Sequence, residues 1–210
     1  MYGAATDKGL IRTNNEDSYA VLPPEADRPG VLVVADGMGG HRKGELASRI
    51  AVDYLVDRLR DILRNDLHPD DVESLLTDLI QKANVRVYVG SLEDPENHGM
   101  GTTLTTAVLT GETLVIGHVG DSRAYRLRGH SLQRMTTDHT LVQEMVDSGS
   151  LTPEQASTHP KRHIITRALG VPEFMPVQIV RSSLQRGDRV LLCSDGLHGS
   201  VSEEVIRQLL

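Results

Sequence analysis

Three apolar segments of this sequence each end in an aspartate that is followed by a small residue. The segment 31–35 runs into Asp36-Gly37, the segment 114–120 into Asp121-Ser122, and the segment 190–194 into Asp195-Gly196. A strand fixes the carboxylate that follows it, and a small neighbour lets the backbone turn and leaves room for a ligand. Simple turn chemistry is the alternative for any single Asp-Gly pair. The run from Asp36 to Gly40 holds three glycines, more than a two-residue hairpin needs, which favours a site.

A further acidic pair, Glu16 and Asp17, precedes the strand-like segment 18–22. A solvated turn is the alternative for this pair taken alone. Carboxylates that share a pocket repel one another, and cations relieve that repulsion. Oxygen ligands without Cys or paired His select Mg²⁺ or Mn²⁺ rather than Zn²⁺, and the spacing of a helix-loop-helix Ca²⁺ site is absent. Two such ions about 3.5–4 Å apart can share a hydroxide and clamp a phosphoryl group.

A phosphate site of this kind also needs a guanidinium group. Arg12 lies four residues before Glu16, and the planar fork of arginine suits bidentate contact with phosphate. A lone arginine is more often a surface residue, which is the alternative here. Arg123 is expected to pair with a carboxylate inside the fold. Cys193 lies in a buried strand pattern, where a thiol behaves as a small hydrophobic group, so we assign it no nucleophilic role.

The elements that must position these residues are mostly strands. Two hairpin signals, Thr110-Gly111-Glu112 and Gly129-His130, predict mainly antiparallel sheets. Strands are expected at 18–22, 31–35, 103–109, 113–119, 123–128, 131–135, 177–181 and 189–193. Apolar residues at helical spacing predict helices over about 43–64 and 70–89, which need a shared apolar face such as a sheet. The fold class is α+β.

The remaining segments are predicted to be loops and short helices. Loops are expected at 23–30 and 93–99. Between 139 and 170 the pattern becomes short and polar, and Thr152-Pro153-Glu154-Gln155 predicts a capping box with proline at the first helical position. This stretch is expected to be a helical excursion over the surface.

Composition excludes several classes of function. The 210 residues carry a net charge of −7, with no Trp, one Phe and five Tyr, which argues against nucleic-acid binding. The single cysteine allows no disulfide framework or zinc ribbon within the chain. No signal pattern and no membrane-spanning run is visible. We therefore expect one soluble, cytoplasmic domain with no nucleic-acid partner and no membrane segment.

Taken together, these residues resemble those of a bacterial member of the metal-dependent Ser/Thr protein phosphatase family, type 2C (PPM). Seven motifs stand in family order over nearly the whole chain. They are Thr6-Asp7-Lys8-Gly9 with Arg12 and Asn15-Glu16-Asp17, the run 34–41 (VADGMGGH), Gly101-Thr102-Thr103, the run 117–123 (GHVGDSR), Thr137-Asp138-His139, the run 166–170 (TRALG) and the run 193–197 (CSDGL).

The resemblance implies both a fold and a reaction. The fold is a four-layer αββα sandwich of two antiparallel sheets flanked by helix pairs, with residues 140–165 as a mobile flap beside the site. The reaction is hydrolysis of phosphoserine and phosphothreonine in proteins through a metal-bridged water. The partners are phosphorylated proteins, the substrates of a Ser/Thr kinase.

The resemblance also implies a role for each site residue. Asp36 bridges two Mn²⁺ or Mg²⁺ ions. Glu16 and the Gly37 carbonyl hold one ion, and Asp195 helps to hold the other. Asp121, together with Asp195, holds a third, weaker ion. Asp17 supports the ligands from behind, and Arg12 binds the phosphate. The catalytic pair is therefore expected to be Arg12 and Asp36.

Two departures from the family pattern bear on these expectations. Some members have a histidine, a proposed general acid, where this chain has Met38, and a methionine cannot donate a proton. His41 is nearby but is left outside the catalytic set, because a lone histidine is more often structural. Relatives also continue past Leu210 with the rest of a helix, an Asp-Asn motif that carries another metal ligand, and a strand. We therefore expect residues 1–210 to be a single catalytic domain truncated at its C-terminus.

These departures leave two alternatives to an active protein phosphatase. The first is a non-catalytic pseudophosphatase that binds phosphoproteins without turnover, because the last metal-ligand motif is absent. The second is a metal-dependent hydrolase of small phosphate esters.

Overall fold

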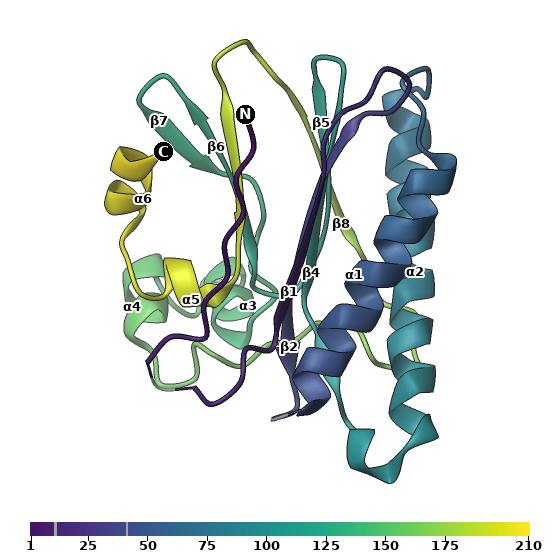
Figure 1. The fold of residues 1–210 in the computed structure, drawn as a ribbon. Coiled ribbons are helices and arrows are strands. Elements are labelled where there is room, and N and C mark those ends of the chain that lie inside the picture. Colours follow the sequence, from purple (N-terminus) through teal and green to yellow (C-terminus); the bar gives the residue numbers. More distant parts are fainter. Residues whose placement is uncertain (11, 41) are drawn as a thin grey trace.

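The strands of the chain form two antiparallel sheets that face each other in the computed structural model, which describes residues 1–10, 12–40 and 42–210 (Figure 1). The larger sheet has the order β1-β2-β4-β5-β8, with β3 paired to β2, and the smaller has the order β7-β6-β9. The larger sheet comprises β1 (Asp17–Leu22), β2 (Gly30–Met38), β3 (Gly101–Thr102), β4 (Leu104–Thr110), β5 (Thr113–Val119) and β8 (Gln178–Ser183). The smaller comprises β6 (Arg123–Arg128), β7 (Ser131–Arg134) and β9 (Arg189–Cys193).

Both predicted hairpins form where the glycines allow a tight turn. Gly111 has φ 55° between β4 and β5, and Gly129 has φ 58° between β6 and β7. Positive φ is costly for residues with a Cβ atom and free for glycine. The antiparallel architecture that these turns predict is confirmed.

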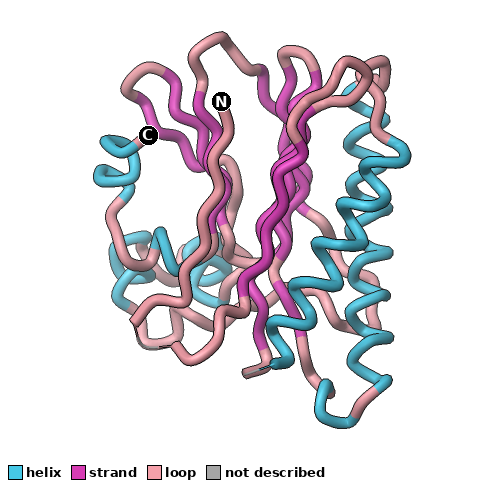
Figure 2. Tube along the Cα trace, in the orientation of Figure 1, coloured by secondary structure: helices cyan, strands magenta, loops and turns pink. Residues whose placement is uncertain are grey.

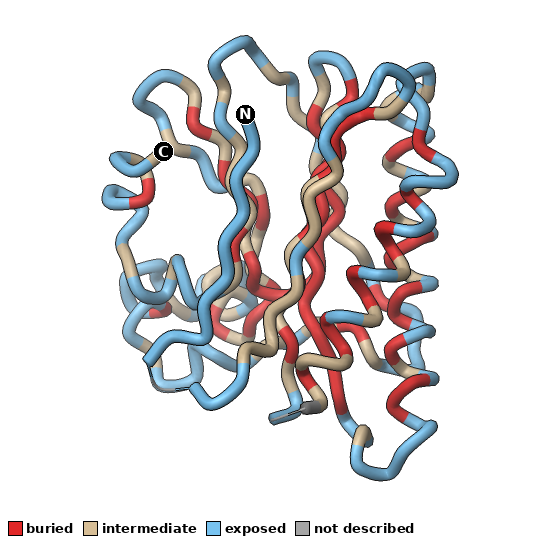
Figure 3. Tube along the Cα trace, viewed as in Figure 1, coloured by how far each residue is buried: buried red, intermediate tan, exposed pale blue. Residues whose placement is uncertain are grey.

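Two long helices cover the outer face of the larger sheet (Figures 1 and 2). They are α1 (Arg42–Ile62) and α2 (Pro69–Glu93), and α2 begins at Pro69 with acidic residues in its first turn, as predicted. Figure 3 colours many residues of both helices as buried. Their buried side chains, among them Leu55 and Ile80, form one core with the residues of β2, β4 and β5 that face them. A smaller core that includes Ala107, Ile116 and Ala124 lies between the sheets.

The other helices are short. A 3-10 turn, η1 (Pro95–Asn97), lies within the loop predicted at 93–99. The polar excursion contains α3 (Leu141–Asp147) and α4 (Pro153–Thr158), which pack on each other, and α4 has the predicted capping box at Thr152. Two more helices follow β9, α5 (Asp195–His198) and α6 (Glu203–Leu209).

The outer layers differ on the two sides of the sandwich. α1 and α2 supply the helix pair expected on the larger sheet. Beside the smaller sheet, the described residues contribute α6, which contacts β7, together with the short helices α3, α4 and α5 (Figure 1). None of the helices in the described ranges combines the length and the apolar character that a bilayer crossing requires.

Candidate metal centre

The candidate ligands meet because of strand register. β1 and β2 pair with Asp17 directly opposite Asp36, so these two side chains share one face of the larger sheet. In the smaller sheet Arg123 pairs with Cys193. The residues just before β6 and just after β9, Asp121 and Asp195, therefore come from adjacent strand ends. All these strand ends lie at the same end of the sandwich.

The backbone of Asp36 is held on both sides by the Gly101-Thr102-Thr103 motif. The Thr103 hydroxyl accepts from the Asp36 N–H at 2.9 Å. The Asp36 carbonyl accepts from the Thr103 N–H at 2.9 Å and from the Thr102 hydroxyl at 3.0 Å. The Thr103 hydroxyl also lies 2.9 Å from the hydroxyl of Ser122, the neighbour of Asp121. This motif therefore ties the Asp36 and Asp121 segments together.

A close approach of two backbone segments places Glu16 beside Gly37. The Glu16 carbonyl accepts from the Gly37 N–H at 3.1 Å and from the Ser48 hydroxyl at 2.7 Å. Gly44, in the first turn of α1, packs against both residues. A Cβ atom on Gly44 would lie 2.7 Å from Glu16 Oε2 and 2.8 Å from the Gly37 carbonyl oxygen. Two oxygen atoms from distant segments thus lie beside Gly44, and oxygen atoms are the ligands that a hard cation takes.

The electrostatics of the pocket are those of crowded carboxylates. Burial, followed by the charges of Asp17, Asp195 and Asp121 in that order, raises the pKa of Asp36 to about 8. Burial, followed by the charge of Asp195, raises the pKa of Asp121 to about 6. Each of these carboxylates makes ionisation of the others less favourable. A nearby cation would therefore stabilise their charged forms.

The donor set fits Mg²⁺ or Mn²⁺, although it is not fully assembled. No three acidic, histidine or cysteine side chains within the described ranges already form a metal-binding group. The fit depends on the oxygen chemistry and on the point shared by Glu16 and Gly37 at Gly44.

Asp17 and Arg12 lie at the edge of the acidic group. Asp17 accepts a hydrogen bond from the Ser194 hydroxyl at 2.8 Å. Burial raises the pKa of Asp17, Ser194 opposes that rise, and the charges of Asp195 and Arg12 act in opposite directions. Arg12 itself is exposed. The structure therefore brings Arg12 within electrostatic range of Asp17 and leaves its guanidinium open to solvent.

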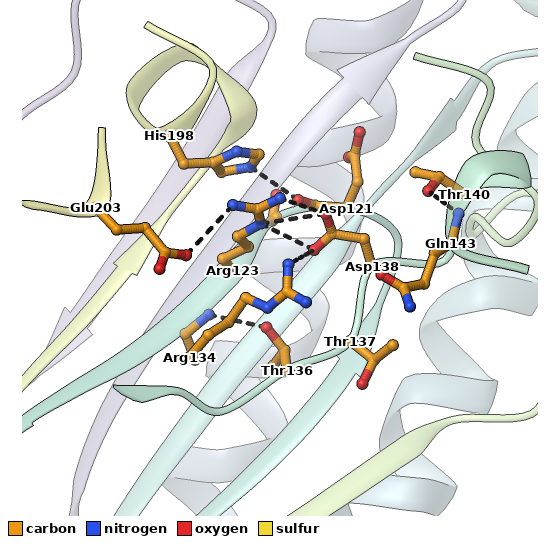
Figure 4. Close-up of polar contacts among 12 residues, drawn as sticks. Asp121, Arg123, Arg134, Thr136, Thr137, Asp138, Thr140, Gln143, His198 and Glu203 are labelled. Atoms are coloured by element: carbon orange, nitrogen blue, oxygen red, sulfur yellow. Dashed lines mark hydrogen bonds and ion pairs between the residues drawn. The ribbon is translucent and has the colours of Figure 1, made fainter. Parts of the chain in front are cut away.

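Polar side chains of α5, of β6 and of the loop after β7 lie near Asp121 (Figure 4). His198 Nε2 lies 3.0 Å from the Asp121 carbonyl oxygen. Because a carbonyl only accepts, this nitrogen carries the proton. Two residues further on, the Arg123 guanidinium binds Asp138 through Nε at 2.9 Å and Nη2 at 2.6 Å. The carboxylate that sequence analysis expected for Arg123 is therefore Asp138.

The polar excursion between residues 139 and 170 has its two ends bound to each other. An isolated bridge joins Thr140 to Ile165. One end of the excursion is bound to Gly120 through His139, and the other end is bound to Thr102 through Leu169. Both anchoring points are next to candidate ligand segments.

Sequence reasoning missed several residues of this region. Gly44, Ser48 and His198 contact candidate ligand residues but stand in no strand-then-Asp pattern. Their only sequence signal was their place within a few residues of a recognised motif. Met38 closes β2 and pairs with Gly101. His41, which sequence analysis left outside the catalytic set, lies outside the described residues.

The chain is similar to bacterial serine/threonine phosphatases. The sequence model of the family described as protein phosphatase 2C matches residues 12–210. The serine/threonine phosphatase stp of Listeria monocytogenes is 40% identical over 205 residues, which are 98% of this chain and 81% of that protein.

Solved structures agree with this similarity. The crystal structure of the Mycobacterium tuberculosis serine/threonine phosphatase PstP/Ppp has a TM-score of 0.86 at 39% identity and covers 99% of this chain and 83% of its own. Staphylococcus aureus Stp1 has a TM-score of 0.90 at 35% identity over 98% of this chain and 80% of its own. The catalytic domain of PstP, in complex with two manganese ions, has a TM-score of 0.82 at 38% identity over 99% of this chain and 83% of its own.

Proposed function

Because this chain belongs to the protein phosphatase 2C family of metal-dependent serine/threonine phosphatases, we propose that it hydrolyses phosphoserine and phosphothreonine in proteins at the acidic pocket around Asp36. The observation that carries this proposal is the register that sets Asp17 opposite Asp36, beside Asp121 and Asp195. High-coverage relatives named as phosphatases support catalysis rather than phosphoprotein binding alone.

The chain depends on divalent cations, and we propose where they bind. Asp36 would contact two ions, Glu16 and the Gly37 carbonyl one of them, and Asp195 the other. Asp121, with Asp195, would hold a third, weaker ion. We propose Mn²⁺ or Mg²⁺ as these ions, and the related PstP domain in complex with two manganese ions supports manganese as one choice. When bound, such a pair of ions supplies an activated water and clamps the phosphoryl oxygens.

The chain's own residues have distinct tasks in this reaction. Asp36 must give up the proton that its raised pKa favours before it can serve as a shared ligand. Arg12 is placed to bind phosphate oxygens and to balance the charge that develops on them. Met38 has no proton to give, so the leaving group takes its proton from water or from another residue. Cys193 takes no part as a nucleophile, because burial raises the pKa of its thiol to about 12.

Residues 140–165 are proposed to act as a flap beside the pocket. They project beyond the two sheets as α3 and α4, and their root is bound to Gly120 and Thr102. Residues 1–210 as a whole are proposed to be one catalytic domain, because the two cores and the strand ends that carry the ligands belong to the same sandwich.

The substrates are phosphoproteins, and we propose that a Ser/Thr kinase of the same cell makes them. Protein phosphorylation consumes ATP, so these substrates are produced in the compartment that holds ATP. On this argument we propose that the protein acts in the cytoplasm.

A chelation experiment tests the proposed function. The chelator should abolish release of phosphate from a phosphothreonine peptide, and Mn²⁺ should restore it. Asp36→Asn should remain inactive at every Mn²⁺ concentration, whereas Asp57→Asn, which changes an exposed carboxylate of α1, should behave as the parent. No turnover at millimolar Mn²⁺ in a folded sample would contradict phosphatase activity. Stronger hydrolysis of a small phosphate ester, in competition with the peptide, would contradict the substrate class.

A further inference from the structure

One recognised motif, Thr137-Asp138-His139, has no part in the chemistry proposed above. It lies between β7 and the flap, and each of its residues binds a different neighbour. The Thr137 N–H donates to Gln178 Oε1 at 3.0 Å, and Asp138 binds Arg123. His139 is buried and binds Gly120, the residue that immediately precedes Asp121.

The contact between His139 and Gly120 uses both polar groups of the glycine backbone. The Gly120 N–H donates to His139 Nδ1 at 3.0 Å, and the His139 N–H donates to the Gly120 carbonyl at 2.7 Å. Gly120 is buried and has φ 109°, and a Cβ atom there would lie 2.5 Å from Thr103 Cγ2. The chain therefore takes a conformation at this position that only glycine adopts readily, and His139 pairs the groups that this conformation removes from the sheet.

We propose that His139 is a positioning residue that fixes the backbone from which the Asp121 carboxylate projects, a role that depends on the cation site proposed above for Asp121. The imidazole suits this task because its Nδ1 accepts a hydrogen bond from an N–H deep within the fold. A backbone N–H left without an acceptor in this buried place would favour rearrangement of the Val119–Gly120 peptide, and with it of the chain that leads into Asp121. Asp121 would then lose the orientation from which it holds a cation.

The His139 ring is itself held in place by a second buried histidine. The rings of His139 and His118 stack with centroids 4.9 Å apart and planes 28° from parallel. His118 Nε2 lies 3.2 Å from the Thr137 carbonyl, and its Nδ1 lies 2.8 Å from the Thr105 hydroxyl. Since the carbonyl only accepts, His118 donates through Nε2 and accepts from Thr105.

His139 also joins the cation site to the root of the flap. Its carbonyl accepts from the Thr166 N–H at 2.8 Å, and the next residue forms the bridge from Thr140 to Ile165. The same residue thus binds the strand end that precedes Asp121 and, through Thr166, the C-terminal end of the flap. A substitution at His139 removes the side-chain contact with the Gly120 N–H and leaves the main-chain contacts of His139 in place. It should therefore disturb the Asp121 segment more than the root of the flap.

Two amide substitutions give a sharp test. Asn places its Oδ1 where His139 Nδ1 lies, since the two atoms stand the same number of bonds from the backbone, whereas Gln carries the same group one carbon further out. We expect His139→Asn to bind Mn²⁺ at the weakest site within about threefold of the parent. His139→Gln and His139→Ala should weaken that binding by about 10–100-fold, the usual range for residues that orient metal ligands.

The measurements are calorimetric titration of the cation-free protein with Mn²⁺ and hydrogen exchange at the Gly120 amide. Exchange at this amide should be at least tenfold faster in the Gln and Ala variants than in the Asn variant. Val31→Ala, which removes buried methyl groups at the far end of β2, controls for general loss of stability. If His139→Ala does not fold, the difference in Mn²⁺ binding between His139→Asn and His139→Gln still tests the positioning role of His139.

Three results have separate meanings. Equal Mn²⁺ binding by the Asn and Gln variants would overturn the role of His139, as would Val31→Ala binding as weakly as Gln. If Asp121→Asn leaves all Mn²⁺ binding unchanged, the proposed role of Asp121 fails, and with it the positioning role of His139. Gly120 exchange would still report whether the hydrogen bond exists.

Discussion

Replacement of Gly44 by alanine should weaken cation binding at the candidate site while the fold persists. Gly44 lies in α1, where alanine is favoured over glycine by up to about 1 kcal/mol. Helix propensity alone therefore predicts a more stable protein. The added methyl group, however, would point at the cradle formed by Glu16 and Gly37.

The size of the effect follows from the contacts. The new Cβ atom would lie 2.7 Å from Glu16 Oε2 and 2.7 Å from the Gly37 carbonyl carbon, whereas ordinary contacts begin at 3.4 Å. Relief of this overlap needs a displacement of about 0.7 Å, the difference between those two distances. Metal–ligand distances tolerate only about 0.2 Å. We therefore expect Mn²⁺ affinity to fall by about 10–100-fold, or by about 1.4–2.7 kcal/mol.

Calorimetric titration with Mn²⁺ measures this affinity, and thermal unfolding without cation checks that the fold persists. Gly90→Ala is the matched control, because Gly90 is a buried helical glycine of α2 whose Cβ atom would meet only the ends of the Ile50 and Met100 side chains. It should bind Mn²⁺ as the parent does. Parental Mn²⁺ affinity in a folded Gly44→Ala variant would refute the assignment of Glu16 and the Gly37 carbonyl as cation ligands.

Four further predictions concern the pocket and the strand β9 beside it. Asp36→Asn should lower turnover of a phosphothreonine peptide by more than about 10³-fold, the loss seen when a single charge-stabilising group is removed, because this carboxylate would serve two ions; activity near the parental level would show that the centre lies elsewhere. Mn²⁺ affinity should rise with pH up to about 8, because the cation displaces the proton that the raised pKa of Asp36 retains. Without cation, the raised pKa of Asp36 contributes to the stability of the fold, and this contribution is complete below about pH 4 and is lost as the pH rises through about 8. The melting temperature should therefore fall over this interval. A Mn²⁺ affinity and a melting temperature that both stay constant with pH would contradict the crowding of carboxylates. Cys193→Ala should retain activity within about twofold, since a buried thiol with a pKa near 12 offers no thiolate; inactivation of a folded variant, measured with the same peptide, would argue for a role of sulfur.

The sequence predicted elements well where local chemistry decides the structure. The strand 113–119 and the strand 189–193 have the expected bounds, and glycine at Gly111 allows the hairpin turn. β2 extends to Met38, beyond the predicted end at residue 35, because β3 pairs with Gly37 and Met38 there. Such pairing between residues more than sixty positions apart leaves no local pattern.

The same distinction applies to the candidate site. Strand ends pointed to Asp36, Asp121 and Asp195, yet the register that sets Asp17 opposite Asp36 follows from packing of the whole sheet. The contacts of Gly44 with Glu16, and of His139 with Gly120, join segments that are remote in sequence. A sequence pattern names residues that could do chemistry, whereas the backbone approaches that orient them are visible only in three dimensions.

The most direct test of the central claim is a crystal structure of the protein grown with abundant Mn²⁺, with the ions located by their anomalous scattering. The account predicts at least two ions at the pocket, both in contact with Asp36, with Glu16 and the Gly37 carbonyl on one and Asp195 on the other. A pocket without manganese, with Glu16 and Asp36 turned away from each other, would contradict it.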